Sequence, residues 1–532
     1  MFAFRHDRLF ALGIWVLADR TPLELVTGAQ SGLNCARTAG EAARRFLKFT
    51  SVGGLLALAT LGSAHAQTEL WRSRYNTGAT DIVGNGTARE AIGAVAIDSI
   101  GNTYVTGISL VGAGNNDYLT VKYNAAGVLQ WATTTENPAP GSQDDHAFAV
   151  GVDGSGNVYV SGYSTYGPGN NDYLTAKYNS AGIQQWAVTF DNPAAGTQND
   201  IAYALAVDSA GSSYVTGQSH SGSNYNYVTV KYNTAGAQQW ASSFNGAGNS
   251  DDIATALVVD GSGNVYVTGQ AYQGFPTGWD FATIMYNSFG VQQWTALLAG
   301  PFNFDVAFAV ALDGSGNSYV TGYTQQDSST GNYLTAKYNS GGALQWSRSF
   351  ENSAVGTQHE TANSLAVDSG GNVYVTGWTA TAGVNDYMTV KYNSAGVQQW
   401  AVPFDNPSPG SQDDVAFALG LDGLGNVYVT GKSHNGVNYD FVTLRYDADG
   451  TQVWAATADG GGNDYGVALK VSSGGGVVVA GTSEGSGQDY MVLKYASAVV
   501  DSTPPTDPTI DFTSPGASVW STDNTVEVTW SG

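Results

Sequence analysis

A tryptophan recurs along most of the chain at intervals of 52 to 60 residues. Two other landmarks keep the same interval, since a tetrad of the Tyr-Val-Thr-Gly type and a pair of the Lys-Tyr type each occur eight times. Units of this length cannot bury a hydrophobic face alone, so they pack on one another in solenoids or propellers. We predict a structural role for the eight tryptophans, Trp71, Trp131, Trp186, Trp240, Trp294, Trp346, Trp400 and Trp454.

One unit, residues 144–190, predicts four β-strands and no helix. Apolar and polar residues alternate in four short stretches, and turn-forming residues such as those of Asp153-Gly-Ser-Gly-Asn157 separate them. Both faces of such a sheet carry apolar side chains, so the sheet needs a neighbour on each side, as in a propeller. The four predicted strands span residues 145–153, 157–163, 172–179 and 183–190.

The order of the strands predicts how the ring closes. The first strand of each unit is rich in small residues and fits the crowded axis, whereas the tryptophan strand fits the wide rim. The series opens with a lone tryptophan strand at 69–75 and ends on a third-type strand at 489–495. We therefore predict an all-β, eight-bladed propeller of four-stranded antiparallel blades, closed by the N-terminal strand. The alternative is a phase with the tryptophan strand first, which closes without this clasp.

The repeat resembles a known family. Leu205-Ala-Val-Asp208 through Tyr214-Val-Thr-Gly217, and the run from Val258 to Gly269, resemble the SBBP type of bacterial β-propeller repeat and are similar to the related NHL repeat. The resemblance covers residues 69–495. It implies a secreted or surface-exposed bacterial protein and almost nothing about a ligand or a reaction.

The first 66 residues are predicted to be a leader with a signal peptide. Arg44, Arg45 and Lys48 precede an apolar run at 49–61, and Ala64-His65-Ala66 follows it, which is the order of a secretory signal cleaved after Ala66. A misassigned start or an extended leader would explain the residues upstream. The apolar run is too short to cross a bilayer and no longer one follows, so we predict a secreted or cell-surface protein without a transmembrane segment.

The propeller is predicted to span residues 67–496. Residues 497–508 contain three prolines and are typical of a stiff linker. Residues 509–532 resemble the start of an immunoglobulin-like or fibronectin type III-like domain, but they are too few for its roughly 7 strands. We therefore expect an incomplete β-sandwich domain and a fragment of a longer protein.

Charge and cysteine content exclude several functions. The net charge is −24, and residues 1–66 hold 7 basic and 4 acidic side chains, which leaves 13 basic and 40 acidic groups beyond them. Binding to nucleic acid requires clustered Lys and Arg, so no nucleic-acid partner is predicted. Cys35 is the single cysteine, and the chain beyond residue 66 therefore has no disulfide or thiolate site.

An acidic residue stands at the entry to every predicted first strand. If these strands line the axis, the carboxylates ring one mouth of the tunnel, where mutual repulsion would favour Ca²⁺; no other cofactor is predicted. The alternative is that each carboxylate accepts local backbone hydrogen bonds or pairs with a lysine. The candidate ligands are Glu90, Asp145, Asp200, Asp252, Asp305, Glu360, Asp414 and Asp464.

Two further series have structural interpretations. Aspartates such as Asp153 and Asp208 end the first strand and are predicted to cap the following turn through their side chains. Basic residues such as Lys122, Lys177 and Lys231 share one position in the third strand, and this predicts an ion pair between blades.

No catalytic residue is predicted, because near-identical repeats lack the asymmetry that a nucleophile, a base and an oxyanion donor require. Loops that depart from the repeat, notably Phe275-Pro276 with Trp279, offer aromatic groups that suit a sugar or a protein surface. We predict a binding or scaffold module for protein or glycan ligands. The alternative is an extracellular enzyme, either polysaccharide-cleaving or quinoprotein-like. The Gly127-to-Trp131 spacing is similar to the blade-docking motif of quinoprotein dehydrogenases and implies packing only.

Overall fold

The computed structural model describes twelve segments of the chain, and all of them lie within one compact unit, Ser63–Val500. The predicted leader, linker and C-terminal domain lie outside the described residues. No helix in the described segments is long and apolar enough to cross a membrane. The segments are 68–77, 80–83, 94–111, 115–135, 144–165, 170–192, 199–352, 359–381, 384–406, 413–472, 475–485 and 487–496.

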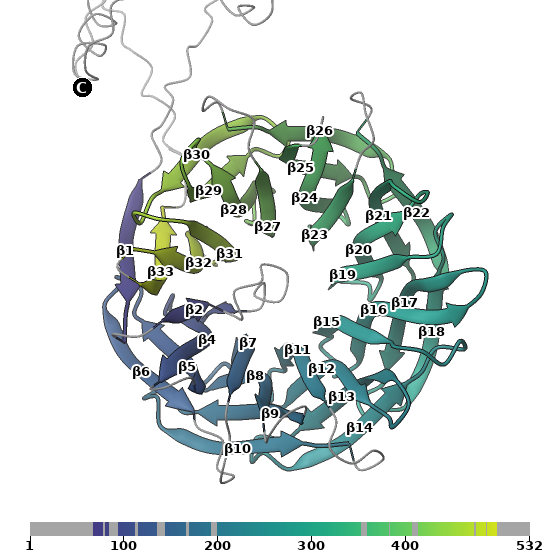
Figure 1. Cartoon of the computed structure of the whole chain (residues 1–532), viewed down its shortest axis with the longest axis horizontal. Coiled ribbons are helices and arrows are strands. Elements are labelled where there is room, and N and C mark those ends of the chain that lie inside the picture. Colours follow the sequence, from purple (N-terminus) through teal and green to yellow (C-terminus); the bar gives the residue numbers. More distant parts are fainter. Residues whose placement is uncertain are drawn as a thin grey trace, which may run out of the picture. The chain divides into compact units, whose positions relative to one another are not determined.

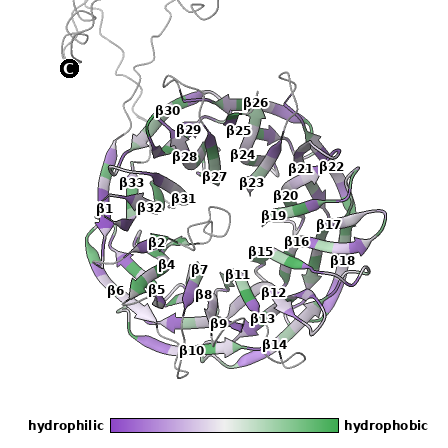
Figure 2. Cartoon of the chain, in the orientation of Figure 1, coloured by the Kyte–Doolittle hydropathy of each residue, from purple (hydrophilic) through white to green (hydrophobic). Residues whose placement is uncertain are grey.

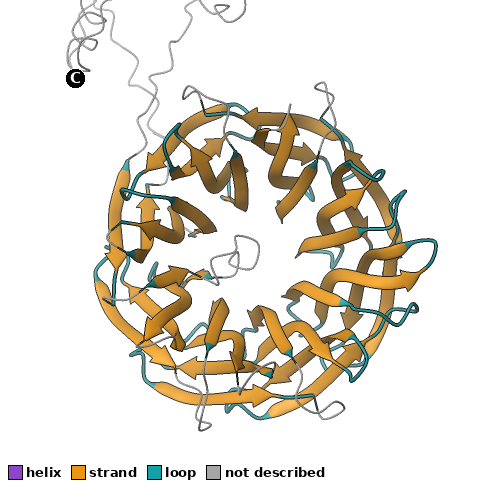
Figure 3. Ribbon diagram, in the orientation of Figure 1, coloured by secondary structure: helices purple, strands orange, loops and turns teal. Residues whose placement is uncertain are grey.

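The described residues form eight antiparallel sheets arranged as blades around a central axis (Figures 1 and 3), which confirms the predicted propeller. From the axis outward, blades 1 to 4 contain β2 (Asp81–Val83) with β3 (Val95–Ile97), β4 (Thr103–Val111), β5 (Asn115–Tyr123) and β6 (Leu129–Thr135); β7 (Asp145–Val152), β8 (Val158–Thr165), β9 (Asn171–Tyr178) and β10 (Gln184–Phe190); β11 (Asp200–Val207), β12 (Ser213–His220), β13 (Tyr225–Tyr232) and β14 (Gln238–Phe244); and β15 (Ile253–Val259), β16 (Val265–Gly274), β17 (Gly278–Tyr286) and β18 (Gln292–Leu298).

The remaining blades follow the same order. Blades 5 to 8 contain β19 (Asp305–Leu312), β20 (Ser318–Gln325), β21 (Gly331–Tyr338) and β22 (Leu344–Phe350); β23 (Glu360–Val367), β24 (Val373–Thr381), β25 (Val384–Tyr392) and β26 (Gln398–Phe404); β27 (Asp414–Leu421), β28 (Val427–His434), β29 (Tyr439–Tyr446) and β30 (Gln452–Ala458); and β31 (Asp464–Val471), β32 (Val477–Glu484), β33 (Gln488–Tyr495) and β1 (Glu69–Tyr75).

The N-terminal strand closes the ring as predicted. β1 pairs antiparallel with β33, from Glu69 opposite Tyr495 to Tyr75 opposite Tyr490, and so becomes the outermost strand of blade 8. Blade 1 departs from the predicted pattern, because its innermost strand is divided into β2 and β3, which both pair with β4. The cause is an insertion between Val83 and Val95 that interrupts the repeat.

The hydrophobic core is divided among the interfaces between blades. Figure 2 shows hydrophobic residues in every blade rather than at one centre. One buried cluster joins Tyr104 and Tyr118 of blade 1 to Val158 and Ala176 of blade 2. Since each blade contributes to the interfaces on its two sides, its packing depends on both neighbours.

Seven tryptophans of the series link their blade to the next one through a hydrogen bond. Trp186 lies in β10 of blade 2. Its indole N–H donates to the carbonyl oxygen of Thr234 at 3.1 Å, in the turn between β13 and β14 of blade 3. Gly236 in that turn has φ +81°, and a Cβ placed there would lie 2.8 Å from the indole ring. The indole ring of Trp186 can therefore pack this closely on the turn only because position 236 is a glycine. Six further indoles donate to the next blade in the same way, from Trp71, Trp131, Trp240, Trp294, Trp346 and Trp400.

The basic residues of the third strand also reach the next blade, but the described residues show no ion pair between blades for them. The ion pair of this series that the structure describes, Lys337 with Asp313 at 3.9 Å, lies within blade 5. Lys177 donates to the carbonyl oxygen of Thr234 at 3.1 Å, and its ammonium lies 4.9 Å from the ring centroid of Tyr159. Asp153 caps its own turn, because it accepts the backbone N–H groups of Ser155 and Asn157. The predicted capping is therefore confirmed, and the cation is held by a carbonyl group and a π face.

Candidate functional site

The predicted acidic residues lie at the start of the innermost strands, between neighbouring blades. Glu90 lies outside the described residues. In blade 1 the equivalent position belongs to Asp81, which pairs with Ser109 as Asp145 pairs with Ser164. Asp81 and the other described members are at most 1% exposed, namely Asp145, Asp200, Asp252, Asp305, Glu360, Asp414 and Asp464.

Three of these carboxylates accept hydrogen bonds both from the connection between two blades and from their own blade. Asp252 accepts the backbone N–H of Gly246 at 2.6 Å, from the connection that follows blade 3, and that of Tyr272 at 2.7 Å, from its own blade. Asp200 and Asp414 accept two backbone N–H groups in the same way. The alternative prediction of local backbone hydrogen bonds is therefore confirmed for these three residues.

The tunnel-mouth Ca²⁺ site stays a prediction. Within the described segments, no group of three or more neighbouring carboxylates contains more than one residue of the acidic series. The structure instead brings Asp200, Asp414 and Asp464 each against two carboxylates of the preceding blade.

Glu360 makes the stability of the fold depend on pH. Burial raises its pKa to about 7, and the hydrogen bonds from Asn352 and Thr379 offset this only in part. A raised acid pKa means that the folded state holds the proton more tightly, so stability is greatest below the ordinary pKa and falls as pH rises through about 7. We expect Glu360→Gln to melt several degrees above the parent at pH 8 and to lose this advantage at pH 5. A melting temperature difference that does not change with pH, measured calorimetrically, would contradict this.

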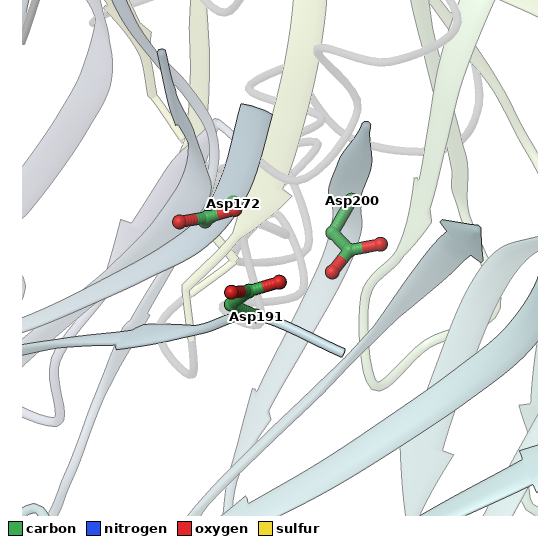
Figure 4. Close-up of side chains that lie close together, drawn as sticks. All are labelled: Asp172, Asp191 and Asp200. Carbon is green, nitrogen blue, oxygen red and sulfur yellow. The ribbon is translucent and has the colours of Figure 1, made fainter. Parts of the chain in front are cut away.

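Three carboxylates meet at the interface between blades 2 and 3 (Figure 4). Asp172 lies at the start of β9, Asp191 directly follows β10, and Asp200 begins β11 of the next blade. Each offers a carboxylate oxygen, and these three oxygens lie within 4.8 Å of one another. Asp172 is 5% exposed and Asp200 1%, whereas Asp191 is exposed. We call this group the Asp172 cluster.

Among the residues that the structure describes, no ion pair balances the charges of the Asp172 cluster. Burial, together with Asp191 and Asp200, raises the pKa of Asp172 to about 7. Burial also raises the pKa of Asp200, although its hydrogen bonds from Asn192 and His220 oppose this. The arrangement can hold a hard cation, for which carboxylate oxygens are the preferred ligands.

The same geometry recurs at two other interfaces. Asp386, Asp405 and Asp414 form a cluster between blades 6 and 7, and Asp440, Asp459 and Asp464 form one between blades 7 and 8. Sequence analysis missed the two carboxylates that precede each first-strand acid. The signal was available, because both Asp172 and Asp386 follow Asn and precede Tyr, and both Asp191 and Asp405 stand between Phe and Asn-Pro.

The inner strands enclose a cavity of about 480 Å³ on the axis. Its described lining is largely apolar, with residues such as Leu205, Leu257 and Leu419, and Lys470 of β31 is its single cation. Lys470 is exposed yet surrounded by the cavity walls, and this removal from bulk water lowers its pKa. Sequence analysis missed Lys470, although it occupies the position of the small residues Gly151 and Ala206.

Aromatic side chains form a continuous surface where blades 4 and 5 meet. Trp279 lies 4.8 Å from Tyr272 and 5.8 Å from Phe304, and Phe304 lies 6.2 Å from Tyr323, all between ring centroids. Phe275, at the tip of the β16–β17 hairpin, is 95% exposed. We call these five residues the aromatic surface. They include the Phe275 and Trp279 positions predicted to hold a ligand.

The closed ring of repeated four-stranded sheets defines the class of the protein as an eight-bladed β-propeller. Three segments, residues 239–276, 293–327 and 345–381, match the SBBP family model, described as a beta-propeller repeat. The chain is therefore a β-propeller with SBBP repeats, in agreement with the resemblance found in the sequence.

Comparison with solved structures finds similar chains at low identity. Sqt1 from Chaetomium thermophilum is 10% identical with a TM-score of 0.47, over 80% of this chain and 100% of that chain. The polysaccharide lyase Uly1 is 11% identical with a TM-score of 0.42, over 81% of this chain and 100% of that chain. Similarities of this size carry no inference about activity. No curated protein matches the chain.

Proposed function

We propose that this propeller is an exported binding module, at the cell surface or in the medium, and that its aromatic surface binds a neutral glycan. The observation that carries the proposal is the row of rings from Tyr272 through Trp279 and Phe304 to Tyr323, with Phe275 exposed beside it. Aromatic faces pack against the apolar C–H faces of sugar rings, and a row of them suits a chain of sugars.

The aromatic surface is held in place before any ligand arrives. The indole N–H of Trp279 donates to the carbonyl oxygen of Asp251 at 3.0 Å, and its backbone N–H donates to that of Asn303 at 3.0 Å. Fixed side chains lose little conformational entropy when they bind. Such preorganisation favours a binding role for Trp279 over a purely local packing role.

The charge of the chain favours a neutral glycan over an acidic one. The net charge is −24, and Asp251, Asp280 and Asp327 lie on the elements that carry or flank the aromatic surface. Like charges would repel a polyanionic polysaccharide, whereas carboxylates can accept hydrogen bonds from sugar hydroxyl groups.

A glycan array probed with the full chain tests this proposal. We expect binding to neutral oligosaccharides, weakened at least tenfold by Trp279→Ala and Phe275→Ala in calorimetric titrations. Phe289→Ala is the matched control, because Phe289 is 79% exposed in blade 4 but lies in the turn between β17 and β18. Equal loss in all three variants, or binding of acidic glycans alone, would contradict the proposal. Shortening of the bound polysaccharide would favour the enzyme alternative instead.

A further inference from the structure

The Asp172 cluster has the dimensions of a cation site. Oxygen ligands lie about 2.3–2.6 Å from Ca²⁺, so two oxygens on one ion can be at most about 4.6–5.2 Å apart. The three carboxylate oxygens of Asp172, Asp191 and Asp200 lie within 4.8 Å of one another. Figure 4 shows the three side chains gathered around a common gap, from β9, the end of β10 and the start of β11. One ion could therefore contact all three.

Asp172 provides a second, independent observation. Its side chain is 5% exposed, and its Oδ1 atom is buried with no hydrogen-bond partner in the described part of the chain. A buried carboxylate oxygen without a partner is costly, and folded proteins rarely leave one unsatisfied. The same is true at the interface between blades 7 and 8, where Asp440 is 3% exposed and its Oδ1 atom has no hydrogen-bond partner within the described segments. A cation in each cluster would supply the missing contact.

At two other interfaces of the same ring, the equivalent charges are absent or are balanced by an arginine. Between blades 3 and 4, the positions of Asp172 and Asp191 are held by Asn226 and Asn245, which are uncharged. Between blades 8 and 1, the position of Asp172 is held by Asp489, which forms an ion pair with Arg74 at 3.0 Å. The described residues contain no ion pair to Asp172, Asp191 or Asp200.

We propose that Asp172, Asp191 and Asp200 bind one Ca²⁺ ion that crosslinks blades 2 and 3. Asp440, Asp459 and Asp464 form the second site of the same kind, between blades 7 and 8. The exposed Asp191 leaves an open side through which the ion enters and where water completes its coordination. With three protein carboxylates, the affinity is expected in the range of extracellular calcium modules, about 10⁻⁴–10⁻³ M.

The role of each ion is to stabilise the ring. Its ligands come from the third strand and outer connection of one blade and from the first strand of the next, so it binds the folded interface and not the unfolded chain. Ligands that bind only the folded state raise its stability with their concentration. This site is independent of the glycan proposal, because none of its ligands belongs to the aromatic surface.

Calcium titration of the full chain tests the inference. We expect CaCl₂ to raise the melting temperature above that in EDTA, and calorimetry to detect sites of about 10⁻⁴–10⁻³ M affinity. Asp172→Asn with Asp191→Asn copies the Asn226 and Asn245 arrangement that the protein already contains, so this variant is expected to fold. It should bind one Ca²⁺ fewer than the parent.

Two further variants complete the test. Adding Asp440→Asn and Asp459→Asn to the first pair should remove a second equivalent and most of the calcium-dependent rise in melting temperature. Asn226→Asp with Asn245→Asp should instead add a site between blades 3 and 4. Retention of the full stoichiometry in the fourfold variant, or a parent whose melting temperature is the same in CaCl₂ and EDTA, would overturn the inference.

Discussion

Deletion of residues 69–75 is expected to destabilise the propeller by on the order of 5 kcal/mol or more. β1 supplies the outer strand of blade 8, and Trp71 donates its indole N–H to the carbonyl oxygen of Ala125 in blade 1 at 3.2 Å. Its loss opens the ring at one interface and leaves β33 with an unpaired edge, which promotes association between chains. Chemical denaturation and size-exclusion chromatography measure both effects.

A circular permutant is the matched control for this deletion. The backbone N–H of Ala496 donates to the carbonyl oxygen of Thr68 at 3.0 Å, so the two ends are adjacent. Residues 68–75 can therefore follow Tyr495 through an Asn-Ser-Ala-Gly turn copied from residues 179–182. The permutant should melt at or above the parent, because the new turn offers a carbonyl group to Trp454, whose buried indole N–H has no partner in the described structure. A permutant as unstable as the deletion would contradict the role of the clasp.

Gly236→Ala is expected to cost roughly 2–4 kcal/mol, a large effect for one methyl group. The residue has φ +81°, which disfavours any Cβ, and the added atom would lie 2.8 Å from the ring of Trp186. The indole must move to avoid this clash. The movement breaks its hydrogen bond to Thr234 and weakens the packing between blades 2 and 3. The free energy of unfolding in urea measures the loss.

Two comparisons separate the causes of this loss. Gly261→Ala places the same methyl group where nothing lies within 4 Å, so it should change stability by no more than about 0.5 kcal/mol. In a Trp186→Leu background, Gly236→Ala should cost less than in the parent, since the clash is with the indole. An equal cost in both backgrounds would show that backbone strain alone is responsible and that the glycine does not serve blade docking.

The repeat made most of the fold predictable from the sequence. The tryptophan interval gave the number of blades, and the lone strand at 69–75 identified the clasp that β1 forms with β33. The division of the first strand in blade 1 escaped prediction, because the insertion after Val83 moves Glu90 into register with the other acids while Asp81 takes their place in space. An alignment of the repeats cannot show whether Asp81 or Glu90 occupies this position in space, because the first repeat is longer than the others.

The candidate site was only partly predictable. The first-strand acids were found, since they share one position in every unit, but their partners come from a different blade. Asp172 and Asp200 belong to consecutive units, and only the packing of β9 against the start of β11 brings their carboxylates together. The predicted ion pair between blades failed for a similar reason, because the sequence does not show that Lys177 reaches a backbone carbonyl group of the next blade.

Disulfide formation between β1 and β33 tests most directly whether the N-terminal strand closes the ring. Ser73 lies opposite Val492, and directly opposed residues of antiparallel strands have Cα separations, about 4.5–5.5 Å, that a disulfide can span. No other cysteine is present beyond residue 66. Oxidation of the Ser73→Cys, Val492→Cys variant should crosslink β1 to β33 quantitatively within one chain and raise the melting temperature. The control variant, Ser73→Cys with Ser347→Cys on β22, should stay reduced. Two free thiols at positions 73 and 492 after oxidation would contradict a ring closed by β1.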